Sequence, residues 1–193
     1  MKAILVLASL LLYSLAPTSS YAQTGEGVTL SELEGATITA GVVREQLLDR
    51  QGQQFSNRFE NKLKLVIGPT KKVEGTEEIT LRSRFGVHKG KPAPILGTLE
   101  RPGEISRYGH GHRVWFFSEG RLTHLRTFTR GGAFRREIAF TRSSGGLTCT
   151  ITEDFAREGG VGEIVTDSAV DGVPLKIISY KQLSSNCRVE KPK

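Results

Sequence analysis

His110 and His112 are the residues whose spacing most directly suggests chemistry. Two histidines two positions apart on a strand project to the same face, as pairs of zinc ligands do in β proteins. A working metal site needs a third protein ligand. The donors that the fold could bring to this pair are His88, His124, Glu104 and Glu119. The pair is therefore interpreted as polar surface histidines, with a metal site, or a metal-dependent or other hydrolytic enzyme, as the alternative.

Arginine is concentrated in residues 113–142. Arg136 is two positions from both Phe134 and Ile138 and therefore lies on the same face of a strand. Arg126 is likewise two positions from Phe128. A guanidinium on a buried face must pair with an acid or bind an anion, because burying an unpaired charge costs several kcal/mol. The arginines of the segment are Arg113, Arg121, Arg126, Arg130, Arg135, Arg136 and Arg142.

Two interpretations of the inner arginines follow from this pattern. In the first, they form internal ion pairs or lie at a rim with their stems against apolar residues. In the second, Arg126 and Arg136 hold the carboxylate or phosphate of a small amphiphile, and its tail contacts Trp115, Phe116 and Phe140.

Other catalytic arrangements are not visible in the sequence. No serine stands in a Gly-x-Ser-x-Gly elbow. The adjacent acids of Glu77-Glu78 and Glu153-Asp154 would point to opposite faces of a strand and could not act as a pair. This inventory favours a non-enzymatic binding or envelope-associated domain that needs no cofactor.

Residues 1–22 are expected to be a secretory signal peptide. Lys2 precedes an apolar run over 3–12, and small residues precede Ala22, after which cleavage is predicted. The run is about half the length of a membrane span, so no transmembrane segment is expected in the mature chain. Residues 23–193 would then form one secreted or periplasmic domain.

Cys149 and Cys187 are the only cysteines of the chain. In an oxidising compartment such a pair is expected to form a disulfide. It would close a loop of 38 positions and stabilise the fold by about 4 kcal/mol through the unfolded state.

The predicted mature chain carries 26 basic and 20 acidic side chains, a net charge of +6. This charge favours anionic partners, such as a small anionic ligand or an anionic envelope surface. Aromatic residues do lie among the arginines, but the predicted export argues against nucleic acid as the natural partner.

The rest of the chain supplies strands to position these residues. Segments 36–48, 55–67 and 77–87 have strand composition, and 112–155 contains four extended segments separated by glycine turns. Leu63, Leu65 and Ile67 alternate with Lys62 and Lys64, as in a strand with one buried face. We expect an all-β fold, an antiparallel meander of about eight to ten strands closed into a barrel, with a two-sheet sandwich as the alternative.

A short helical turn, long up-and-down strands and a late disulfide resemble the outline of lipocalins. The lipocalin Gly-x-Trp motif is missing, since Gly35 is followed by Ala36 and Thr37. The resemblance therefore concerns architecture alone and implies no ligand.

Overall fold

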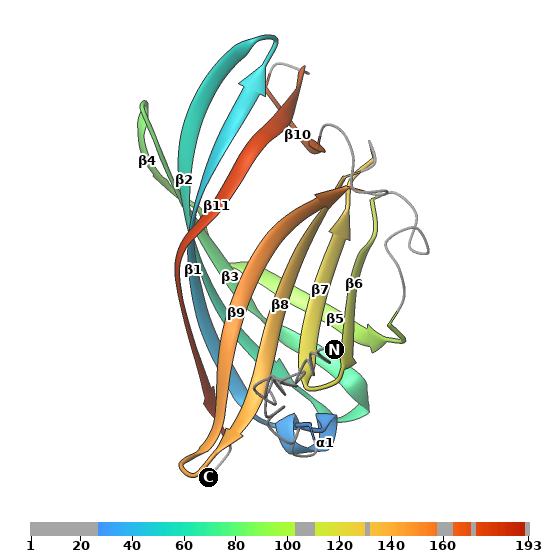
Figure 1. Ribbon diagram of the computed structural model, residues 1–193. Coiled ribbons are helices and arrows are strands. Elements are labelled where there is room, and N and C mark those ends of the chain that lie inside the picture. The colour runs from blue at the N-terminus through green and yellow to red at the C-terminus, as the bar shows by residue number, and fades with distance from the viewer. Residues whose placement is uncertain (1–26, 103–110, 130–131, 158–163, 171–172, 192–193) are drawn as a thin grey trace, which may run out of the picture.

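The computed structural model describes residues 27–102, 111–129, 132–157, 164–170 and 173–191. These residues form a nearly closed barrel whose sheet follows a path of ten strands (Figure 1). The predicted all-β barrel is confirmed. The predicted signal peptide lies outside the described residues. Within them, no helix combines the length and apolar character needed to cross a membrane.

Most of the described elements are strands, as the alternating sequence predicts. The first two helical segments and five strands are α1 (Leu30–Leu33), β1 (Thr37–Arg50), β2 (Gln53–Ile67), η1 (Pro69–Lys71), β3 (Lys72–Ser83), β4 (Gly86–Lys89) and β5 (Ala93–Glu100). The remaining strands are β6 (Arg113–Ser118), β7 (Arg121–Thr127), β8 (Gly132–Ser143), β9 (Gly146–Arg157), β10 (Ile164–Val170) and β11 (Val173–Glu190).

The strand order is β10-β11-β1-β2-β3-β5-β6-β7-β8-β9, and β4 pairs only with β3 in the described sheet. Most neighbours are antiparallel, but β5 and β6 are parallel, with Leu99 opposite Trp115. This pair departs from the hairpin wiring that the short connections suggested. The last strand, β11, continues to Glu190 and contains Cys187.

Side chains close the seam between β9 and β11. The predicted disulfide between Cys149 and Cys187 is present, with a Cα–Cα distance of 5.4 Å. Farther along, the Gln182 side-chain oxygen accepts from the Glu153 backbone N–H at 2.9 Å, and its nitrogen donates to the Ile151 carbonyl at 3.1 Å. An amide side chain therefore makes the bonds that a neighbouring strand would make.

An apolar core surrounds Leu33 of α1, and α1 lies at the lower end of the barrel (Figure 1). Thr29 and Glu32 form a capping box at the start of α1, and Leu33 is fully buried in the core. Gly35 then donates its N–H to the Ile67 carbonyl at 2.8 Å, which ties the helical turn to β2. The inward rows of β1, β2, β8 and β9 supply Ile38, Ala40, Val42, Leu63, Leu65, Ile67, Ile138, Phe140 and Ile151.

Candidate functional site

The inward rows change from apolar to polar at one level of the barrel. On β1, the inward-facing residue after Val42 is Arg44. On β8, the inward-facing residue next to Ile138 is Arg136. The antiparallel register of β6 to β9 then sets inward residues side by side in two rows. The lower row is Trp115, His124, Arg136 and Glu153, and the upper row is Arg113, Arg126, Phe134 and Phe155.

Glu153 is the centre of a buried ion network. Its side chain is fully buried and accepts from Arg136 Nε at 2.7 Å, from Asn61 Nδ2 at 3.2 Å, and from Arg44. Arg136, also buried, donates to Glu77 at 2.6 Å, which links β8 to β3 on the other side of the lumen. Two carboxylates therefore pair with two guanidiniums. These contacts are internal ion pairs, as in the first interpretation of Arg136.

Proton affinities in the network follow from its charges. Burial favours a protonated Glu153, but the charges of Arg136 and Arg44 outweigh it and hold the pKa of that carboxyl below its ordinary value. Burial likewise opposes the charged form of Arg136, and the carboxylates of Glu153 and Glu77 outweigh it and raise the pKa of that guanidinium. Glu153 and Arg136 are therefore both ionised at neutral pH.

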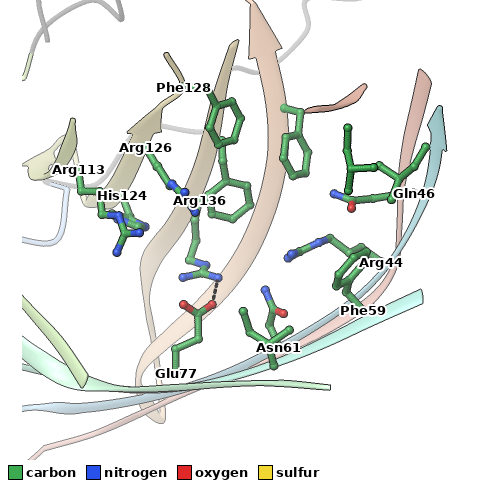
Figure 2. Close-up of a pocket in the computed structure, with 15 residues that line it drawn as sticks. Arg44, Gln46, Phe59, Asn61, Glu77, Arg113, His124, Arg126, Phe128 and Arg136 are labelled. Atoms are coloured by element: carbon green, nitrogen blue, oxygen red, sulfur yellow. Dashed lines mark hydrogen bonds and ion pairs between the residues drawn. The ribbon is translucent and has the colours of Figure 1, made fainter. Parts of the chain in front are cut away.

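A cavity of about 370 Å³ lies beside this network. Figure 2 shows its walls, with Arg113, His124 and Arg126 on one side and Arg44 and Gln46 on the other. Its aromatic and aliphatic lining residues are Leu48, Phe59, Ile79, Phe128, Phe134, Phe155 and Leu175. The cavity thus combines apolar surface with a few converging charged groups, which is the composition of ligand-binding sites.

Several guanidiniums of the cavity lie against aromatic rings. Arg44 is 5.1 Å from the centre of the Phe59 ring, and Arg126 is 5.4 Å from that of Phe128. Arg136 is 5.2 Å from the Phe134 ring centre. These cation–π contacts orient the three guanidiniums in the cavity wall.

Arg113 and Arg126 face each other directly across β6 and β7. Like charges in this position repel each other. Below them, His124 stacks on Trp115 with ring centres 4.4 Å apart. Burial, then the charges of Arg136, Arg113 and Arg126, lower the pKa of His124 to about 3, so its imidazole is neutral at physiological pH.

The cavity carries an excess of positive charge. Among the described residues, four arginines and one carboxylate, Glu77, line it. Even with Glu153 included, the arginines around the cavity outnumber the carboxylates by two among these residues. Within the same residues, Arg113 has no carboxylate within 4.0 Å, and the buried His124 Nδ1 and Arg44 Nε have no hydrogen-bond partner. These groups could bind an anion that enters the cavity.

The structure separates the residues predicted for the ligand into three places. Arg126 and Arg136 both line the cavity. Trp115 and Phe140 belong to the main core, with Trp115 reaching the site through His124. Phe116 packs on the other face of the sheet against the Val114 cluster. The aromatic surface of the cavity comes from four phenylalanines, Phe59, Phe128, Phe134 and Phe155.

The predicted histidine pair cannot be followed to a site. His110 lies outside the described residues, and His112 is exposed and pairs through its backbone with Thr127. In the described part of the chain, no three His, Cys, Asp or Glu side chains are grouped to hold a metal ion. His124, one of the further donors considered, faces the arginine cavity.

Sequence reasoning missed Arg44, Asn61, Glu77 and Glu153 as members of the site. A usable signal existed for Arg44, which follows Ile38, Ala40 and Val42 on an inward row. Its partner Glu153 is 109 residues away in the chain, and no local pattern connects the two.

Comparisons with protein-family models, with curated proteins and with solved structures found no match to this chain.

Proposed function

We propose that this protein is a non-enzymatic binding protein, secreted or periplasmic, that takes a small anionic amphiphile into the cavity of its barrel. The observation that carries the proposal is the excess of arginine over carboxylate around an aromatic-lined cavity. An anion entering there would be attracted by both Arg113 and Arg126, which lie side by side on β6 and β7.

The head group that suits the upper row is a carboxylate or a phosphate. Guanidiniums donate paired N–H bonds in a plane, which match two oxygens of either group. Neutral His124 has one nitrogen that can donate and one that can accept, so it adds a hydrogen bond and no charge. Hydrogen bonds to charged groups of this kind contribute about 1.5 to 3 kcal/mol each.

The tail would lie against the phenylalanine rings on the same cavity walls. A volume of 370 Å³ holds roughly twelve groups of about 30 Å³, the share of one water molecule in the liquid. Decanoate, with ten carbons and two oxygens, is therefore a suitable probe. Burial of its methylenes would contribute about 0.8 kcal/mol each.

Calorimetric titration with decanoate, and with decyltrimethylammonium as a cation of equal tail length, tests the proposal. We expect decanoate to bind and the cation to bind at least ten-fold more weakly. Replacing one anion contact, in Arg113→Gln or Arg126→Gln, should weaken decanoate by about ten-fold or more. The matched control is Arg121→Gln on the same strand as Arg126, because Arg121 is exposed and pairs with Glu137 at 2.6 Å.

Equal affinity for the two probes would refute the proposal, as would a loss in Arg121→Gln equal to that of the cavity variants. Native mass spectrometry of the protein recovered from its own envelope adds a second test, in which a co-purified anionic amphiphile is expected. The same spectrum reports export, since cleavage after Ala22 leaves Gln23 as the first residue.

A further inference from the structure

The β3–β4 hairpin presents large apolar side chains to solvent. Phe85 at its tip is 84% exposed and Val87 on β4 is 61% exposed. A two-residue turn joins the strands, with Ser83 paired to Gly86, and Gly86 has a φ of 120° that favours glycine. Phe85 is held in place by its own N–H, which donates to the Ser83 hydroxyl at 3.2 Å. This bond constrains the backbone of the turn and keeps Phe85 at its tip.

The same hairpin is strongly basic. Residues 81–91 contain four cations and no acid. Arg82 pairs with Glu60 on β2 at 2.8 Å, and Lys89 pairs with Glu78 on β3 at 3.1 Å. Within the described residues, Arg84 and Lys91 have no carboxylate within 4.0 Å. The Arg84 guanidinium lies 4.7 Å from the centre of the Phe85 ring, so charge and apolar surface meet at the tip.

The hairpin also projects from the barrel. Figure 1 shows β4 standing away from the wall that β6 to β9 form, and β4 has β3 as its only partner in the described sheet. An aromatic tip with a basic collar is the arrangement that places rings at the boundary of a bilayer and cations near its phosphates.

We propose that the β3–β4 hairpin docks the protein on the surface of an anionic phospholipid bilayer, with Phe85 and Val87 entering the headgroup boundary and Arg84 and Lys91 contacting lipid phosphates. Charge complementarity selects this occupant. A stable protein partner needs about 800 Å² on each side, which a four-residue strand and its turn do not offer. A bilayer needs only a small apolar tip and nearby cations.

Docking would set the cavity close to the lipid. Ile79, which lines the cavity, lies on β3 four residues before the hairpin turn. At about 3.3 Å per residue this separation is roughly 13 Å. The inference itself depends on the hairpin alone and stands whether or not the cavity binds an amphiphile.

Co-sedimentation with vesicles of phosphatidylcholine, with and without one third phosphatidylglycerol, tests the docking. All variants are compared in the same processed form, with the N-terminus checked by mass spectrometry. We expect binding to the anionic vesicles only, weakened by added salt. Arg84→Gln with Lys91→Gln should weaken it about 25-fold, since each cation near an anionic surface contributes about five-fold, or about 1 kcal/mol. Phe85→Ser should weaken it about ten-fold.

Two control variants match these changes at other exposed positions. Lys71→Gln with Lys72→Gln removes the same charge at the other end of β3, and Leu96→Ser removes a side chain that is 76% exposed on β5. Both should bind the vesicles as the parent does.

Equal sedimentation with both vesicle types, or equal losses in hairpin and control variants, would overturn the inference. Absence of vesicle binding would overturn it too and would leave an acidic protein as the partner of the hairpin. Decanoate titration of the hairpin variants separates this result from the proposed function, because the cavity residues are unchanged in them.

Discussion

Replacing Glu153 by glutamine should be among the most damaging conservative changes in this chain. The substitution keeps the size of the side chain and removes one charge. Glu153 is fully buried and is the shared partner of Arg44 and Arg136. After the change Arg136 keeps Glu77, whereas Arg44 has no other carboxylate among its contacts in the described residues. One guanidinium is then buried without a counter-charge.

The expected loss of stability follows from comparison with other buried ion pairs. Removing one partner of such a pair costs about 3 to 5 kcal/mol, because the other charge stays desolvated. Domains of this kind are stable by about 5 to 15 kcal/mol in all. Glu137→Gln is the matched control, since Glu137 also meets two arginines, Arg121 and Arg135, but both of these are exposed. Exposed pairs contribute less than about 1 kcal/mol.

Urea unfolding of the oxidised protein at pH 7, followed by circular dichroism, measures both variants on one scale. We expect Glu153→Gln to lose at least 2 kcal/mol more than Glu137→Gln, with similar slopes in urea. A loss no larger than that of the control would show that water or a rearrangement screens Arg44. The reasoning about an ion network in a dry lumen would then be wrong.

Three further changes test other parts of the fold. Because the pKa of His124 is about 3 in the folded chain and near 6.5 in the unfolded chain, protons bind the unfolded state first, and stability falls as the pH drops below 6.5. Between pH 6.5 and 4.5, His124→Phe should remove about 2.5 kcal/mol of this loss in the free energy of unfolding. Urea unfolding at each pH measures the loss, and a variant with the same pH profile as the parent would contradict the expectation. Cys149→Ser with Cys187→Ser should cost about 4 kcal/mol, and the reduced parent should match it in the same urea experiment. Gln182→Leu should speed amide hydrogen exchange at Glu153 on the seam while leaving exchange in the β1–β2 hairpin unchanged.

The barrel could be predicted because one rule operates along most of the chain. Leu63, Leu65 and Ile67 alternate with lysines, and the structure buries all three on the lumen side. Alternation does not encode which strand lies beside which, so the parallel β5–β6 pair was not predictable. The end of β11 is too polar to show this alternation. Its residues 184–188 pair with β1, and Asn186 lies close over Gly41, where a larger residue would collide with it.

The candidate site was predictable only in part. Arg126 and Arg136 could be selected because each breaks an apolar inward row, and both line the cavity. Their aromatic neighbours depend on which strands curve over the cavity. Phe59 and Phe155 come from strands far apart in sequence, and they reach the same cavity only through closure of the barrel. Contacts of this range leave no local pattern in a single sequence.

The width of the barrel links the ion network to the cavity. Eight strands enclose a lumen that side chains just fill, and ten enclose more space. In this protein α1 and the apolar core occupy one end, and long side chains bridge the middle. A buried network of this kind is no more stable than apolar residues of equal volume. The network therefore contributes to the shape of the cavity beside it and adds no stability over such residues. Arg44 and Arg136 form a charged floor, and above it the phenylalanines, Arg113 and Arg126 enclose the cavity in which we propose that an anion with a short apolar tail binds.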